Sequence, residues 1–189
     1  MSVVGYKARN HPQQVRVRGA LADVDDRATS WEDLRPVDAR FGFTIDVAAS
    51  GANAKCARFW TAEDDGLAQS WTGERVWCNP PYSPPNLQLW VTKAWAESRA
   101  GCPLIVMLVA ANRTEQRWWQ ECIEPNRDRG PGSVRTEFLP GRMQFIAAGA
   151  KGIGPNERPP FGCCLLIWGE DIPDPAPATF TQGTLEPAS

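Results

Sequence analysis

A short apolar run meets a pair of prolines in Arg75-Val76-Trp77-Cys78-Asn79-Pro80-Pro81-Tyr82. The run at 75–78 has the length and composition of a buried strand. Adjacent prolines cannot extend the hydrogen bonds of a sheet or enter a helix interior, so the strand must end before Pro80. We therefore expect Asn79 and Tyr82 in a rigid loop at the carboxyl end of a strand.

Segments on both sides of this loop predict further strands and helices. Strands are expected at 41–49, 103–110, 134–139 and 163–168, and helices at 87–100 and 117–123, with shorter helical starts after Ser30 and at 50–57. Strands that alternate with helices indicate an α/β fold with an open, mostly parallel central sheet. Ligands of such sheets bind beyond the carboxyl ends of the strands, where Asp46 and Asn79 are both expected.

Length and composition are those of one globular domain. The chain has 189 residues, of which 42% are hydrophobic and 22% charged. We expect the domain at 29–170, a polar and flexible leader at 1–28, and a proline-rich, disordered tail at 171–189. No stretch approaches the roughly 20 apolar residues that cross a bilayer, and the first residues lack a secretion signal. The sequence therefore predicts a cytoplasmic protein.

Cysteine spacing and charge indicate neither a metal site nor a uniformly basic protein. The six cysteines include no C-x-x-C pair and mostly lie in apolar runs, and the one histidine, His11, lies in the leader. Because the net charge is −2, phosphate binding needs a local basic cluster. Six arginines between 113 and 142 form a candidate, although interleaved acidic residues fit an ordinary solvated face equally well.

Asn79-Pro80-Pro81-Tyr82 carries the groups that activate a planar amino nitrogen. The exocyclic amino group of adenine is a poor nucleophile because its lone pair is delocalised into the ring. The Asn79 side-chain carbonyl and the Pro80 backbone carbonyl can accept its hydrogens, and the two prolines hold both acceptors in place. Tyr82 offers a flat face for a base extruded from a duplex. A strand-ending turn with a packed tyrosine is the structural alternative.

A pocket for a methyl donor is expected upstream of this motif. In place of a glycine-rich turn, Asp46-Val47-Ala48-Ala49-Ser50 follows the first strand, with small side chains and a carboxylate that can bind an amino group. Asp65 in Asp64-Asp65-Gly66 is a second candidate, although an ordinary turn explains it as well. The glycine-rich segment at 149–154 lacks a following Lys-Ser or Lys-Thr pair, so a mobile loop over substrate or a surface loop is expected there.

Spaced blocks of the chain resemble the phage-type DNA N6-adenine methyltransferase family, the Dam-like proteins of bacteriophages and prophages. The main blocks are residues 41–50, Asn53-Ala54-Lys55-Cys56-Ala57-Arg58-Phe59, Asp64-Asp65-Gly66-Leu67 and Val76-Trp77-Cys78-Asn79-Pro80-Pro81-Tyr82-Ser83. Further similarity at 113–119 and 138–145 extends the match over 29–169. The resemblance implies a single-domain, Rossmann-like methyltransferase that transfers a methyl group from S-adenosylmethionine to adenine in DNA.

The resemblance also assigns residues by position. The motif residues implied to be catalytic are Asn79, Pro80, Pro81 and Tyr82. The residues implied to bind the cofactor are Thr29, Asp46, Ala48, Ala49 and Asp65. At the pocket edge or facing DNA it places Arg113, Thr114 and Arg142. The family usually has Thr-Pro before the first strand, whereas here Thr29 is followed by Ser30. That departure leaves open how the carboxylate of the cofactor is held.

Three alternatives use the same features. A protein glutamine methyltransferase shares the acceptor chemistry, but such enzymes resemble a longer architecture for which 189 residues leave little room. A cytosine N4 methyltransferase usually has Ser in place of Asn79. A catalytically inactive nucleic-acid-binding module would not need Asn79 and Tyr82 intact. Since no element that reads base edges is identifiable, short or relaxed site specificity is expected.

Overall fold

A mixed sheet of five strands forms the centre of the fold, in the order β2-β3-β4-β7-β5. The computed structural model describes residues 27–130, 132–147, 161–169 and 172. β2 (Ile45–Asp46), β3 (Arg75–Cys78) and β4 (Leu104–Ala110) are parallel neighbours. β7 (Cys163–Gly169) runs antiparallel to β4 on one side and to β5 (Arg135–Phe138) on the other. In the described part of this sheet, β7 is therefore the one reversed strand.

The α/β class expected from the sequence is confirmed. The sheet, which we expected to be mostly parallel, is mixed, because β7 pairs antiparallel with both of its neighbours. Other expectations concern residues outside the described ranges: His11 and the leader up to residue 26, the glycine-rich segment at 149–154, and the tail from 173 onward. No helix in the described ranges is both long enough and apolar enough to cross a membrane.

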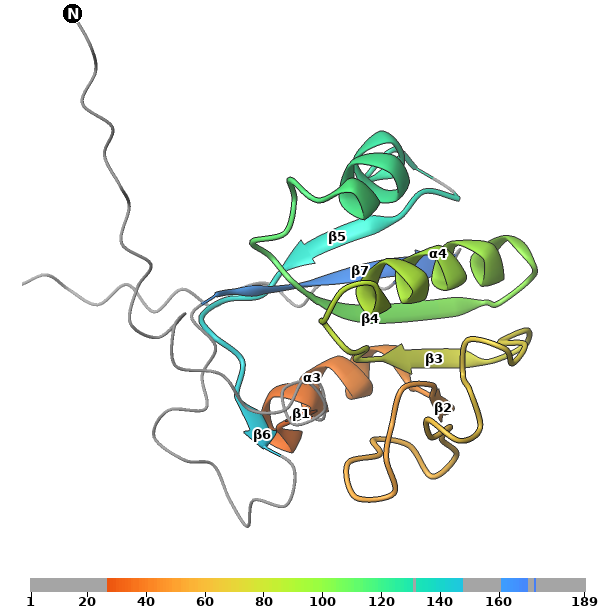
Figure 1. Cartoon of the computed structure of the whole chain (residues 1–189), viewed down its shortest axis with the longest axis vertical. Coiled ribbons are helices and arrows are strands. Elements are labelled where there is room, and N and C mark those ends of the chain that lie inside the picture. Colours follow the sequence, from red (N-terminus) through yellow and green to blue (C-terminus); the bar gives the residue numbers. More distant parts are fainter. Residues whose placement is uncertain (1–26, 131, 148–160, 170–171, 173–189) are drawn as a thin grey trace, which may run out of the picture.

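Helices cover both faces of the sheet, and α4 lies along β4 in Figure 1. α4 (Asn86–Arg99) and the π-helical turn η1 (Trp119–Ile123) pack on one face, and α3 (Trp31–Phe41) packs on the other. The two core clusters take alternate residues of β4, Ile105 on the first face and Val106 on the second. Every residue of β4 is buried, as a strand covered on both faces requires.

A two-stranded ribbon lies outside the main sheet. β1 (Arg27–Thr29) pairs antiparallel with β6 (Phe145–Ala147), and the backbone N–H of Ser30 donates to the Gln144 carbonyl at 3.0 Å. The ribbon therefore fixes the position of Thr29 directly before α3 begins.

The segment at 41–49 differs from the strand expected there. Phe41 is the last residue of α3, and Gly42 ends the helix with a φ of 60° in the left-handed region. Only Ile45 and Asp46 pair as a strand. The apolar residues at 41–49 alternate with glycine and threonine, a pattern that is typical of a strand. In the structure, however, Gly42 is the residue at which the helix ends.

The segment at 50–57 forms turns rather than the start of a helix. The backbone N–H of Ser50 donates to Asn53 Oδ1 at 2.7 Å, and that of Lys55 donates to Asp46 Oδ2 at 3.0 Å. Side-chain acceptors thus take the N–H groups that a helix would use. The expected helix at 117–123 is instead η1, followed by the 3-10 turn η2 (Glu124–Asn126).

Candidate active site

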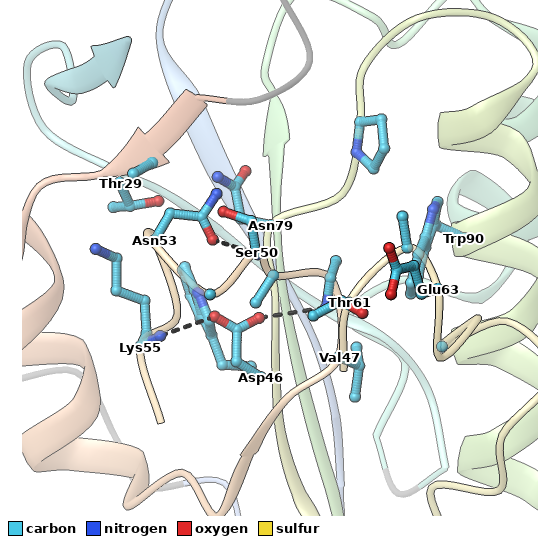
Figure 2. Close-up of a pocket in the computed structure, with 18 of the residues that line it drawn as sticks. Thr29, Asp46, Val47, Ser50, Asn53, Lys55, Thr61, Glu63, Asn79 and Trp90 are labelled. Atoms are coloured by element: carbon cyan, nitrogen blue, oxygen red, sulfur yellow. Dashed lines mark hydrogen bonds between the residues drawn. The ribbon is translucent and has the colours of Figure 1, made fainter. Parts of the chain in front are cut away.

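A cavity of about 530 Å³ opens at the carboxyl ends of β2 and β3 (Figure 2). The two strands are parallel neighbours with Asp46 opposite Trp77 in register, so the residues after both strands meet at one edge. Its lining comes from the end of β1, the segments at 46–55 and 61–66, the end of β3, and α4. The volume lies within the range of about 300–1,000 Å³ that small-molecule sites occupy.

Asp46 is a buried carboxylate in the wall of this cavity. It is 3% exposed, and its oxygens accept the N–H of Lys55 at 3.0 Å and the N–H of Ala48 at 3.3 Å. Burial raises the pKa of Asp46 to about 6, although the two N–H groups and the Lys55 cation act to lower it. A partly desolvated carboxylate of this kind favours a cationic partner.

The turn at 61–66 supplies two more carboxylates to the cavity. Asp64 stabilises the turn itself, because its Oδ2 accepts the N–H and the hydroxyl of Thr61, both at 2.8 Å. Asp65, with a φ of 51° in the left-handed region, lines the cavity together with Glu63. The ordinary-turn interpretation therefore fits Asp64, while Asp65 reaches the cavity.

Gly66 lets this turn approach β2 closely. A Cβ atom at Gly66 would lie 2.2 Å from the Val47 carbonyl oxygen, so only glycine fits without a shift of the backbone. The indole N–H of Trp71 donates to the Gly66 carbonyl at 2.9 Å, and the Trp71 ring stacks on Trp90 at 6.1 Å between centroids. Trp90 in turn lines the cavity, so the turn and α4 together supply an aromatic wall.

Asn79 and Pro81 line the cavity directly after β3, and Pro80 is buried between them. The loop then turns into α4, where the N–H of Asn86 donates to the Ser83 carbonyl at 2.8 Å. Figure 2 shows Asn79 and Asp46 projecting from neighbouring strand ends. A polar amide and a carboxylate thus share one cavity.

Tyr82 does not line the cavity in this structure. Its hydroxyl donates to the Leu108 carbonyl at 3.2 Å, and its ring makes an edge contact with Phe145 at 6.4 Å between centroids. Burial holds the pKa of Tyr82 well above its usual range, while the nearby Arg113 cation acts to lower it. The ring that we expect to stack on a base is packed against the core beside the motif.

Three of the six arginines between 113 and 142 are paired with acidic side chains. Arg117, Arg127 and Arg135 form ion pairs with neighbouring carboxylates, as in the charged-face interpretation. Arg113 is half-buried, whereas Thr114 and Arg142 are exposed. None of these three residues lines the cavity. Arg113 is thus the arginine of this group whose charge acts on the pKa of Tyr82.

Two polar groups line the cavity near the start of α3. Thr29 is 1% exposed, and its hydroxyl oxygen has no hydrogen-bond partner among the described residues. Lys55 is half-buried, and its Nζ lies 5.0 Å from the ring centroid of Trp31. Burial lowers the pKa of Lys55, and the Asp46 carboxylate partly offsets this. A buried hydroxyl at a cavity wall can donate a hydrogen bond to a ligand atom there.

The sequence profile of a protein family described as DNA N-6-adenine-methyltransferase (Dam) matches residues 20–176. This chain belongs to the Dam family. It is 32% identical over 118 residues to a DNA N-6-adenine-methyltransferase of Escherichia phage T1, covering 61% of this chain and 44% of the relative. It is 31% identical over 104 residues to the enzyme of the same name from Haemophilus phage HP1 (strain HP1c1), covering 54% and 58%. The chain spans about half the length of these curated relatives.

Membership of this family implies S-adenosylmethionine as the methyl donor, and the cavity fits such a molecule. Carboxylates face the cavity where an ammonium group and ribose hydroxyls need acceptors, Trp90 offers a ring face, and the Thr29 hydroxyl lacks a partner among the described residues. Within the described ranges, no group of three or more His, Cys, Asp or Glu side chains is arranged to hold a metal ion.

The cavity brings together every residue that the sequence predicts at the cofactor: Thr29, Asp46, Ala48, Ala49 and Asp65. It also contains residues that sequence reasoning missed, among them Lys55, Glu63 and Trp90. Lys55 lies inside one of the blocks that resemble the family, which was a usable signal. For Trp90 the sequence contains no such signal, because an aromatic residue at helical spacing is equally typical of a side chain buried in the hydrophobic core.

Proposed function

We propose that this protein transfers a methyl group from S-adenosylmethionine to the exocyclic N6 of adenine in DNA. The observation that carries the proposal is the cavity itself, in which Asn79 and Asp46 lie at the carboxyl ends of neighbouring parallel strands of a Dam-family chain. DNA as substrate follows from the names of the family and its relatives. We also propose that the protein acts in the cytoplasm of a bacterial host, a proposal supported by the phage origin of its DNA-modifying relatives.

The sheet supports a Rossmann-like methyltransferase fold within residues 29–170. Three parallel strands and β5 point in one direction, helices cover both faces, and β7 alone runs the other way in the described sheet. The cavity lies beyond the carboxyl ends of β2 and β3, where open α/β sheets bind their ligands.

The proposed chemistry depends on two acceptors in the Asn-Pro-Pro-Tyr loop. Asn79 Oδ1 and the Pro80 carbonyl oxygen each accept one hydrogen of the adenine amino group, which localises the nitrogen lone pair. Because Pro80 and Pro81 have fixed φ angles, the acceptors are in place before the base arrives. S-adenosylmethionine supplies a methyl group on a cationic sulfonium, so no strong base is needed. The amino nitrogen attacks this methyl carbon while the bond from carbon to sulfur breaks and S-adenosylhomocysteine leaves. The methylated nitrogen then loses one proton to water.

The cofactor end of the proposed site is built from two carboxylates, two alanines and an aromatic face. Asp46 binds the ammonium group of the methionine moiety, and Asp65 accepts from the adenine amino group of the cofactor. Ala48 and Ala49 leave the backbone after β2 accessible, since neither carries a side chain beyond Cβ. Trp90 supports the adenine ring, as an aromatic wall of a small-molecule pocket does.

The proposed DNA contacts lie outside the cavity. Arg113 and Thr114 follow β4 at the same sheet edge as Asn79, and Arg142 is exposed after β5. Arginine at such positions neutralises phosphate and orients the duplex without reading sequence. The Tyr82 ring has to leave its contact with Phe145 before base and ring can stack.

The test is a methyl-transfer assay with an Asn79→Ala control. The full chain is incubated with methyl-labelled S-adenosylmethionine and unmethylated DNA, which is then digested to nucleosides. We expect label in N6-methyladenosine, lost in the variant while cofactor affinity persists. Label in the nucleoside of N4-methylcytosine would show that cytosine, and not adenine, is the methylated base. A bound cofactor without labelled DNA would favour a protein glutamine substrate, and failure to bind the cofactor would leave an inactive nucleic-acid-binding module.

A further inference from the structure

The cavity wall carries more negative than positive charge. Among the described residues that line it, three are carboxylates, namely Asp46, Glu63 and Asp65, and the one cation is Lys55. S-adenosylmethionine carries a sulfonium, an ammonium and a carboxylate. The acidic wall suits the two cationic groups, whereas the carboxylate needs a positive partner that this wall offers only at Lys55 within the described ranges.

Lys55 is held in place without pairing to a described acidic residue. Its backbone N–H is bound to Asp46 Oδ2, which fixes the chain where the side chain departs. No described carboxylate forms an ion pair with its Nζ. The ammonium group lies instead over the ring of Trp31, the first residue of α3. An anionic ligand would stabilise a half-buried ammonium group in this position.

The same end of the cavity holds a second donor. The Thr29 hydroxyl is buried without a partner among the described residues, and Thr29 lies two residues before Trp31. Figure 2 shows Thr29 and Lys55 at one side of the cavity, Glu63 and Trp90 at the opposite side, and Asn79 between them. The N-terminal end of α3 adds a favourable field for an anion.

Building on the proposed function, we propose that Lys55 binds the carboxylate of S-adenosylmethionine, with the Thr29 hydroxyl as a second donor. Lys55 is then a positioning residue: it fixes the methionine end on one side while the adenine end lies toward Trp90. The sulfonium is thereby held in the middle of the cavity, near Asn79.

Nearby cations are engaged elsewhere. Arg58 forms an ion pair with Glu74 at 2.8 Å, and its side chain is 64% exposed. Arg75 donates to the backbone carbonyls of Phe41 and Gly42. Neither arginine lines the cavity. Arg58 therefore serves as a matched control, since its removal also deletes one positive charge from the same segment.

The test compares two ligands that differ by one carboxylate. Binding of S-adenosylmethionine and of decarboxylated S-adenosylmethionine is measured by titration calorimetry at about pH 7.5, where Asp46 is ionised. Lys55→Met should weaken S-adenosylmethionine binding by roughly 10- to 100-fold, as expected for losing a charge-assisted hydrogen bond. It should leave the decarboxylated ligand within about twofold of wild type. Lys55→Arg should recover part of the loss, and Arg58→Met should change neither ligand.

The outcomes separate this inference from the proposed function. Equal losses for both ligands would overturn it, because Lys55 would then act through Asp46 or through the fold. Unchanged binding in Lys55→Met would also overturn it. If Lys55→Met is destabilised, Thr29→Val keeps the side-chain shape and should weaken only the carboxylate-bearing ligand; an equal loss contradicts the inference. A wild-type chain that binds neither ligand refutes the proposed function itself.

Discussion

A methyl group at Gly66 has no room in this fold. The Cβ of Gly66→Ala would lie 2.2 Å from the Val47 carbonyl oxygen and 3.0 Å from the Trp90 ring. Trp71 holds the Gly66 carbonyl at 2.9 Å, so the turn at 61–66 cannot simply retreat. The Val47 carbonyl must therefore move by roughly 1 Å to reach an ordinary contact distance.

The displaced peptide is the one that supports the Asp46 carboxylate. The Val47 carbonyl and the Ala48 N–H belong to the same peptide unit, and that N–H donates to Asp46 Oδ1 at 3.3 Å. Overpacking of this kind costs about 1–3 kcal/mol of folding stability. Each kcal/mol lowers the Tm of a chain of this size by about 2–4 °C. Loss of one hydrogen bond to Asp46 adds roughly a fivefold loss of cofactor affinity.

Thermal unfolding followed by circular dichroism, and titration with S-adenosylmethionine, measure the two effects. Gly162→Ala is the matched control, because the nearest atom to its Cβ would be a carbonyl oxygen at 4.0 Å and its φ is not left-handed. The control should melt within about 1 °C of wild type. A Gly66→Ala variant that melts and binds as wild type does would refute the reasoning.

Three further predictions concern charge and hydrogen bonding. Because the folded pKa of Asp46 is raised to about 6, its carboxylate is ionised only above that pH; cofactor affinity should fall by about tenfold from pH 7.5 to pH 5, and Asp46→Asn should flatten the profile. Glu137→Gln removes the carboxylate that accepts two hydrogen bonds from Arg40, at 2.6 and 2.8 Å, and so links α3 to β5. Urea unfolding should show that the free energy of unfolding falls by about 1–3 kcal/mol. An unchanged urea midpoint would contradict this prediction. Tyr82→Phe removes the hydrogen bond to the Leu108 carbonyl, so stability should fall by about 0.5–1.5 kcal/mol while methyl transfer persists; an inactive, stable variant would show that the hydroxyl itself acts.

The strand ends at the site could be predicted because local chemistry decides them. Adjacent prolines end β3 after Cys78 whatever the rest of the chain does. The run at 104–110 is apolar at every position, so it had to be covered on both faces. Asp46 and Asn79 consequently share an edge once the two strands are parallel neighbours.

Features that depend on distant contacts could not be predicted in this way. The turns at 50–57 exist because Asp46 captures the Lys55 N–H, and that capture carries Lys55 into the cavity. The Tyr82 ring is turned toward Phe145, which is more than sixty positions later in the chain. The direction of β7 depends on its pairing with β4 and β5, and an apolar run has no direction of its own.

The reversed strand has a consequence for how the protein is made. β7 is the last described strand to leave the ribosome, yet it belongs between β4 and β5, which are synthesised earlier. Until it arrives, the nascent chain exposes an unpaired edge of β4, a wholly apolar strand, and β5 lacks the neighbour with which it pairs. We expect the growing chain to depend on chaperones until residue 169 has emerged, and a message truncated before β7 to yield aggregates rather than a weakened enzyme.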